Sequence, residues 1–184
     1  MFAEHGYKAV SLRSILRECG ANTAAAHYHF GSKQELLEAI FARRCAGMNP
    51  ERLRLLTTCV VEPGRPPIVE QILDAFLRPS LVWMNDDRGT RRFMRLRAVV
   101  AYEREELARN LIARYFNDTS RRFIDALAKA LPQIGMEELY FRFHFLLGAQ
   151  YYTLLNPNRV SDLSGGLCDP ADAEKALRHM VCSF

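Results

Sequence analysis

Hydrophobic residues along this chain recur mainly at intervals of three and four, the spacing of a helix that buries one face. Ile72, Leu73, Phe76 and Leu77 are a clear example within residues 68–85. Strand signals are weak, because period-two alternation and the turn dipeptides Asn-Gly and Asp-Gly are absent. The pattern therefore predicts an all-α fold of eight or nine helices without a sheet.

Capping residues and helix breakers divide the first third of this pattern into short segments. Ser11 begins one helix, Gly20 ends it, and Asn22 caps the next. Ser32 and Glu35 form a capping box, in which each side chain accepts a hydrogen bond from the other residue's backbone amide. The predicted helices span 11–19, 22–28 and 32 to the mid-fifties.

Larger helices are predicted beyond a linker rich in proline and glycine at 62–67. They span 68–85, 90–102, 104–131 and 136–155. A last helix begins with Asp169 as its N-cap and Pro170 at the favoured first position. With a first short helix that Gly6 can end, three short helices thus precede a larger helical body.

The segment 11–28 has the form of a helix–turn–helix, because its connection, Cys-Gly-Ala-Asn, is short and contains glycine. Leu12, Ile15 and Leu16 form one inward face. The second helix is small and polar at its front, which lets its backbone approach the floor of a DNA major groove. Tyr28, the adjacent histidines and Lys33 supply donors for phosphates.

His27 and His29 raise the alternative of a metal site. Residues two apart on a helix point to different sides, and no Cys or acidic residue completes a ligand set there. We therefore expect no bound metal. We interpret His29 as a residue that supports the end of the helix and Phe30 as a residue that fills the small hydrophobic core.

Composition narrows the class of protein. The 184 residues are 49% hydrophobic with a net charge of +4, which permits an anionic partner without requiring one. Five cysteines without a Cys-x-x-Cys pair indicate a reduced, cytoplasmic protein. The sequence contains no nucleophile–base pair, glycine-rich phosphate loop or metal-ligand spacing, and no apolar run long enough to span a membrane. It therefore predicts no enzymatic activity, cofactor or membrane partner.

Arginines are concentrated between positions 88 and 122, where ten stand against four acidic residues. A solvated helix face is the favoured interpretation, and a second nucleic-acid patch is the alternative. Arg97 differs from the others because Leu96, Ala98 and Val99 surround it. Arg97 either points inward, where it would bind the acidic group of a ligand, or extends its aliphatic part along the protein so that the guanidinium reaches solvent.

Aromatic side chains in the second part are predicted to form its core, and some of them to line an apolar cavity. The candidate ligand contacts are Trp83, Phe93, Arg97, Phe116, His144 and Gln150. For His144, a satisfied core histidine is the favoured interpretation. Gly148 and Ala149 permit close helix approach, either at a dimer seam or within one subunit.

The first part of the chain resembles a known family. FAEHGYKAVSLRSILRECGANTAAAHYHFGSKQELLEAIF is similar to the DNA-binding domain of TetR regulators, through Phe-x-x-x-Gly-Tyr, Ser-Leu-Arg, Gly-x-Asn and Tyr-His-Phe-Gly-Ser-Lys-x-x-Leu. The resemblance implies a set of residues that face DNA or support the reading helix: Ser11, Arg13, Asn22, Thr23, Ala24, His27, Tyr28, His29 and Lys33. Many family members carry tyrosine where His27 stands.

The second part, with FRFHFLLGAQYYTL and LSGGLCDPADAE, resembles the C-terminal domain of a PsrA-like branch. The resemblance implies a DNA-binding domain over 1–45 and a ligand-binding and dimerisation domain over 46–184. The function it implies is a homodimeric transcriptional repressor. A small, largely apolar molecule would release it from its double-stranded DNA operator.

Family members have further residues before the Phe-x-x-x-Gly-Tyr motif, which form most of the first helix and support the reading helices. We expect this chain to lack that support. The alternative function is therefore a ligand-binding dimer whose DNA binding is impaired.

Overall fold

The computed structural model describes residues 1–21, 31–59, 67–82, 88–103 and 106–184. These residues form nine helices and no strand, which confirms the all-α prediction. The helices are α1 (Phe2–Ala9), α2 (Leu12–Glu18), α4 (Lys33–Thr58), α5 (Val69–Leu81), α6 (Arg88–Tyr102), α7 (Glu106–Ala130), α8 (Met136–Leu155), α9 (Arg159–Leu163) and α10 (Ala173–Cys182). The helix predicted over 22–28 lies outside the described residues.

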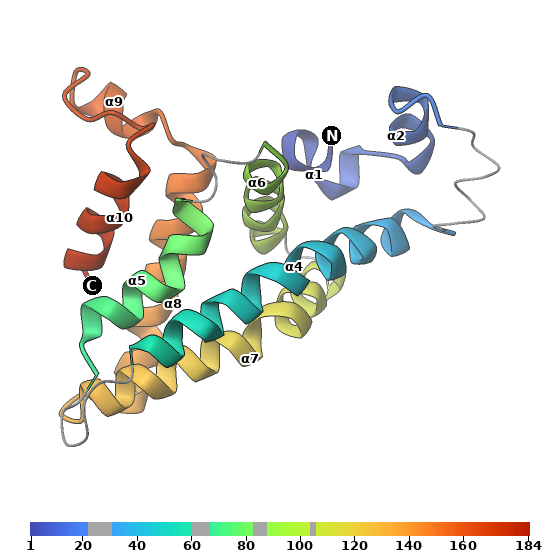
Figure 1. Cartoon of the computed structure of the whole chain (residues 1–184). Coiled ribbons are helices and arrows are strands. Elements are labelled where there is room, and N and C mark those ends of the chain that lie inside the picture. Colours follow the sequence, from blue (N-terminus) through green and yellow to red (C-terminus); the bar gives the residue numbers. More distant parts are fainter. Residues whose placement is uncertain (22–30, 60–66, 83–87, 104–105) are drawn as a thin grey trace.

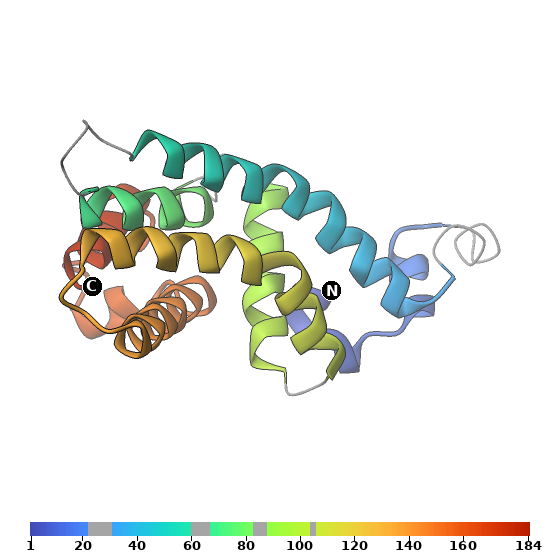
Figure 2. The same ribbon diagram turned by 90° about the horizontal axis from the view of Figure 1, so that it is seen from below.

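The long helices α4 and α7 run side by side and form the length of the molecule (Figure 1). Figure 2 shows α6 crossing both of them. α1 packs against α6 at one end, and α10 packs against α5 at the other. The predicted domain boundary between residues 45 and 46 falls inside α4, so one continuous helix serves both parts of the chain.

Local hydrogen bonds explain where the short helices begin and end. Ser11 Oγ accepts from the Ser14 amide at 3.0 Å and the Ser11 amide donates to Ser14 Oγ at 3.1 Å, a complete capping box. Gly20, with a φ of 62°, ends this segment in a conformation that favours glycine. Ser32 Oγ accepts from the Glu35 amide at 3.1 Å, so the hydroxyl half of the second predicted box is present.

The last helix begins later than predicted. Asp172 is its N-cap and accepts from the Lys175 amide at 2.9 Å. Asp169 instead accepts from the Ala171 amide at 2.8 Å, two residues on. The prediction that Asp169 caps the helix is therefore wrong, because its side chain closes a turn that precedes the helix.

One hydrophobic core extends through the helical body, and aromatic rings connect its layers. Phe41 on α4 is fully buried, and its ring centroid lies 5.4 Å from that of Phe93 on α6 and 6.4 Å from that of Phe116 on α7. Leu12 and Leu16 form a small separate cluster beneath α2. The part of the molecule that carries α2 is thus joined to the body through α1 and α4.

The helix α8 is apolar on a face that the other described helices leave uncovered. Its exposed large side chains are Met136, Tyr140, Phe141, Phe145 and Tyr152. None of the described helices combines the length and apolarity that crossing a bilayer requires. The five cysteines are all free.

We predict that Asp172→Ala lowers the free energy of unfolding by about 1 kcal/mol, because α10 loses the acceptor for its first free amides. The matched control is Asp169→Ala, which removes a carboxylate from the preceding turn. This variant should lower the free energy of unfolding less than Asp172→Ala does. Urea denaturation followed by circular dichroism measures both values. A larger loss for Asp169→Ala would contradict the assignment of the cap.

Candidate DNA-binding surface and ligand site

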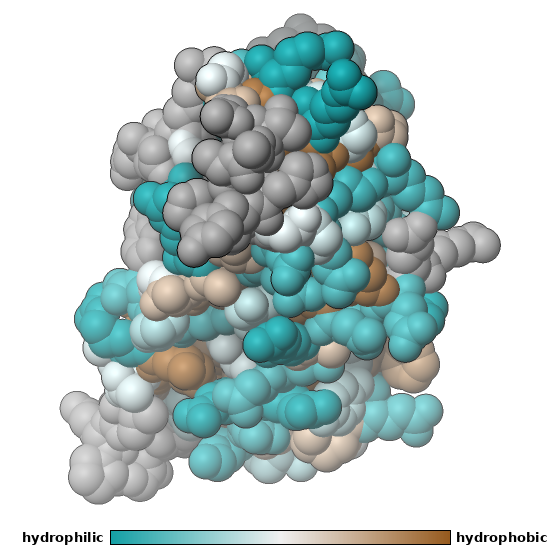
Figure 3. All heavy atoms as spheres, turned by 90° about the vertical axis from the view of Figure 1, so that its right-hand side faces the viewer, coloured by the Kyte–Doolittle hydropathy of each residue, from teal (hydrophilic) through white to brown (hydrophobic). Residues whose placement is uncertain are grey.

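The exposed face of α2 carries two of the residues predicted to face DNA. Ser11 and Arg13 are exposed, while Leu12 and Leu16 turn inward. Figure 3 views the molecule from the side of α2, and its described surface there is mostly hydrophilic. Six further predicted residues lie outside the described part of the chain: Asn22, Thr23, Ala24, His27, Tyr28 and His29.

Lys33 connects the start of α4 to α1. Its Nζ donates to the Tyr7 carbonyl at 2.9 Å and lies 4.1 Å from the centroid of the Tyr7 ring. The ammonium group is therefore already engaged within the protein. The predicted phosphate contact of Lys33 stays a prediction, and it would use the donor capacity that these contacts leave.

Glu103, the residue directly after α6, also contacts the backbone of α1. Its Oε1 accepts from the Tyr7 amide at 2.8 Å. Gly6 makes this approach possible, because its φ of 79° suits glycine and a Cβ there would lie 3.3 Å from the same oxygen. Position 6 thus needs glycine both for its backbone conformation and for space.

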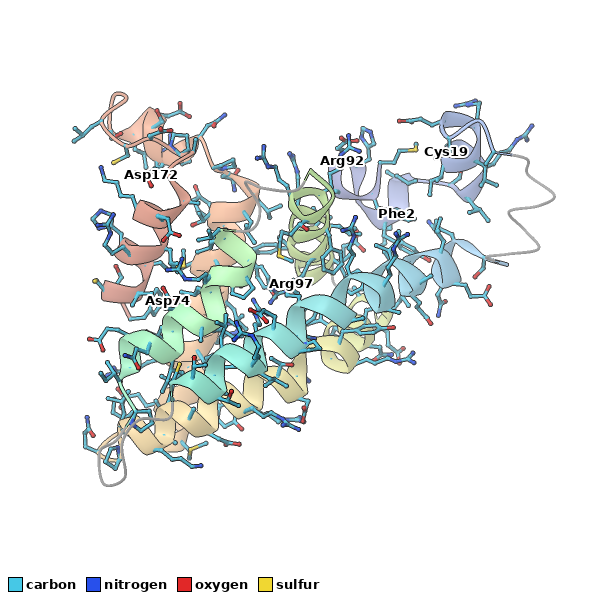
Figure 4. The ribbon with its side chains drawn as sticks, in the orientation of Figure 1. Phe2, Cys19, Asp74, Arg92, Arg97 and Asp172 are labelled. Atoms are coloured by element: carbon cyan, nitrogen blue, oxygen red, sulfur yellow. The ribbon has the colours of Figure 1, made fainter. Side chains whose placement is uncertain are left out.

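Arg97 lies inside the molecule, near the crossing of α6 with α4 (Figure 4). The residue is 1% exposed, and its Cζ lies 4.2 Å from the ring centroid of Phe116 and 5.2 Å from that of Tyr151. Arg97 Nε and Nη1 have no hydrogen-bond partner among the described residues. Of the two orientations that the sequence left open, Arg97 takes the inward one.

A second buried arginine joins three helices. Arg52 on α4 is also 1% exposed, and it donates from Nε to the Phe76 carbonyl at 2.8 Å and from Nη2 to Ser80 Oγ at 3.2 Å. The buried amide of Gln150 on α8 donates to the same Ser80 oxygen, while Gln150 Oε1 has no partner in the described structure. Arg52 is therefore fixed by a network that ties α4 to α5 and α8.

The interior around the two buried arginines is positively charged, and no described acidic side chain balances that charge. Burial, and then the charge of Arg97, lowers the pKa of Arg52. Burial raises the pKa of the Cys45 thiol to about 12, so this neighbour stays neutral. Guanidinium groups nevertheless stay protonated in proteins near neutral pH. Two guanidinium groups thus lie buried in the interior, and neither forms an ion pair with a described carboxylate.

A groove of about 590 Å³ lies beside this cluster, between α6, α7 and α8. His144 is exposed and lines it, so the interpretation of this residue as a core histidine is wrong. Gly148 also lines it, and a Cβ there would meet nothing within 4 Å, so close packing within the subunit does not explain this glycine. Tyr151 lines the groove and stacks on Arg97, which connects the two features.

The structure brings four of the predicted ligand residues into the interior. Arg97 and Phe116 are in contact, Gln150 belongs to the Ser80 network, and Phe93 packs in the core against Phe41. Trp83 lies outside the described residues.

The sequence did not predict a role for Arg52, Ser80 or Tyr151. Only Arg52 carried a signal, because Cys45, Met48 and Arg52 follow the three-to-four spacing of one helix face, and all three are buried.

Comparison with known families matches both parts of the chain. Residues 1–40 match the family described as bacterial regulatory proteins, tetR family, and residues 74–183 match the tetracyclin repressor-like C-terminal domain. A search of curated proteins gave no match. Together with the all-α fold, these matches show that the chain belongs to the TetR family of DNA-binding transcriptional regulators.

Proposed function

We propose that this protein is a homodimeric repressor that a small, largely apolar molecule releases from its DNA operator. One observation carries the proposal. Glu103 lines the groove beside the buried arginines, and the same carboxylate accepts the Tyr7 amide of α1. A molecule that enters the groove therefore meets the side chain that holds the DNA-binding part in place.

Release would follow from a shift in population between two arrangements of the dimer. Reading helices of a two-fold dimer must lie about 34 Å apart to enter successive major grooves. Displacement of Glu103 would remove the hydrogen bond that fixes the backbone of α1 at Tyr7, so that α1 and α2 would shift relative to α6. A change in that separation is sufficient to weaken operator binding.

The uncovered face of α8 supports the dimer. Phe141 and Phe145 lie one helical turn apart on it, with ring centroids separated by 6.2 Å, and they are 56% and 58% exposed. Exposed aromatic patches of this kind mark sites of association. A second copy of the same helix would cover the patch on both subunits.

Operator binding is tested with Arg13→Ala and DNA from upstream of the protein's own gene. We expect wild type to bind this DNA, less tightly as salt rises, and Arg13→Ala to bind about tenfold less tightly, because a charged contact is lost. Fluorescence anisotropy measures both affinities. Arg159→Ala is the control, since it removes the same charge from α9, which Figure 1 shows on the opposite side of the view from α2.

Equal losses from Arg13→Ala and Arg159→Ala would contradict a DNA-facing role for Arg13. If wild-type protein binds none of this DNA even at low salt, the repressor proposal fails. The alternative function, a ligand-binding dimer with impaired DNA binding, would then be favoured.

The dimer is tested with Phe145→Asp. We expect this variant to sediment as a monomer with an unchanged helical circular dichroism spectrum, because a buried carboxylate without a partner opposes association. Leu163→Asp places the same charge on an apolar residue of α9 that is 69% exposed, and it should remain dimeric. A Phe145→Asp dimer as tight as the wild-type dimer would exclude this face of α8 from the interface.

The link between the groove and α1 is tested with Glu103→Ala. This variant should bind DNA several-fold less tightly and exchange the Tyr7 amide hydrogen faster, because that amide loses its acceptor. Glu103→Gln retains an acceptor oxygen and should stay close to wild type in both measurements. Unchanged exchange at Tyr7 in Glu103→Ala would show that the contact does not hold α1.

A further inference from the structure

Gly148 lies where the uncovered face of α8 meets the groove between α6, α7 and α8. We propose that Phe145 of the partner subunit packs over Gly148 in the homodimer, closes the mouth of this groove and thereby completes the ligand site. The inference deepens the proposed function, because it rests on the homodimer and on the groove proposed there.

The first argument is the glycine itself. Gly148 stands inside α8, where glycine is less favourable than every residue except proline. It is exposed, its φ is not positive, and a Cβ at this position would meet no described atom within 4 Å. Neither the backbone conformation nor the described packing within the subunit therefore requires glycine here. A neighbour from outside the subunit accounts for the missing side chain.

The second argument is the spacing along α8. Phe141, Phe145, Gly148 and Tyr152 follow one another at intervals of four, three and four residues, so they lie on one face of the helix. The three large side chains of this exposed strip are all more than half exposed. A large side chain next to a missing one makes the strip complementary to a second copy of itself.

The third argument is two-fold symmetry. When residue i of one subunit contacts residue j of its partner in a two-fold interface, residue j also contacts residue i. An axis between positions 145 and 148 pairs these two positions and also places position 141 opposite position 152. Phe145 of the partner subunit then fills the open space at Gly148, and the same contact recurs on the other side of the axis.

This contact reaches the ligand site because Gly148 also lines the groove. His144, one helical turn before Gly148, lines the groove as well, and its ring centroid lies 6.3 Å from that of Phe145 in the same subunit. Tyr102 from α6 lines the groove and is more than half exposed, so a single subunit leaves the groove open to solvent. A phenyl ring from the partner shields the groove from water, which favours an apolar molecule.

The contact is tested by changing the small and the large side chain separately. In Gly148→Leu the new side chain meets the partner subunit's Phe145, and in Phe145→Ala a gap remains over Gly148. Both variants should dimerise about tenfold less tightly than wild type in sedimentation equilibrium, with unchanged helical circular dichroism. Gly47→Leu on α4 is the control and should dimerise like wild type, because Gly47 is also exposed with no described atom within 4 Å of a Cβ.

A mixture of the two variants separates a contact between subunits from an effect within one helix. In the mixed dimer, the leucine introduced at position 148 faces the alanine introduced at position 145, and the original Gly148 faces the original Phe145. The mixed dimer should therefore dissociate about tenfold less readily than either variant dimer. Native mass spectrometry measures the three dimers, and a purely statistical distribution among them would overturn the contact.

Closure of the groove is tested with N-phenyl-1-naphthylamine, an uncharged apolar dye whose fluorescence increases when it leaves water. At concentrations where each protein is dimeric, Phe145→Ala and Tyr102→Ala should bind the dye several-fold less tightly than wild type. Leu163→Ala, at an exposed apolar position outside the groove, should bind it like wild type. Dye affinity that Phe145→Ala or Tyr102→Ala leaves unchanged would overturn the closure, as would a wild-type dimer that binds no dye.

These measurements use no DNA, so their failure is distinct from that of the proposed function. A wild-type dimer whose variants mix statistically refutes this inference alone. Wild-type protein that stays monomeric refutes the proposed homodimer and this inference with it. A dimer that closes the groove but binds no DNA refutes only the proposed repressor.

Discussion

A guanidinium group cannot easily give up its charge near neutral pH, and this constraint organises the interior of the molecule. Arg52 satisfies it in part, because a carbonyl and a hydroxyl accept its hydrogen bonds and connect α4 to α5 and α8. Arg97 is buried against aromatic rings with two donor atoms unpaired among the described residues. The helices around it therefore enclose a positive charge that no described carboxylate balances.

This interior is connected to the DNA-binding part by short physical links. α4 passes without interruption from the cap at Ser32 to the network around Arg52. α6 carries Arg97 in its middle and leads directly to Glu103, which holds the backbone of α1 at Tyr7. One helix thus connects Arg97 with the residue that contacts α1. Lys33 binds the Tyr7 carbonyl from α4, so α1 lies between the two helices that meet the buried cluster.

The sequence predicted those features that depend on local rules. The limits of α8 follow from its flanking breakers and agree with the predicted span 136–155, and Ser11 and Ser32 cap the helices assigned to them. The start of α10 was mispredicted because Asp169 and Asp172 are both acceptable caps, and only the folded turn selects between them. Local pattern is ambiguous wherever two capping residues stand close together.

The cluster around the two buried arginines was harder to predict, because its contacts join distant parts of the chain. Arg97 stood out among apolar neighbours, but its inward orientation depends on Phe116 and Tyr151, which other helices supply. Ser80 lies in an ordinary helix, and only its contacts with Arg52 and Gln150 give it a role. His144 lies on an apolar helix, yet it faces the groove, because the burial of α8 is one-sided.

We propose that ligand binding in the groove and DNA binding at α2 are coupled through the contact between Glu103 and the Tyr7 amide. Hydrogen exchange at the Tyr7 amide of full-length wild-type protein, measured with and without bound DNA, tests this coupling. Linkage is reciprocal, so DNA that binds better when α1 is held against α6 should slow this exchange. Exchange at Tyr7 that stays unchanged when DNA binds would contradict the coupling.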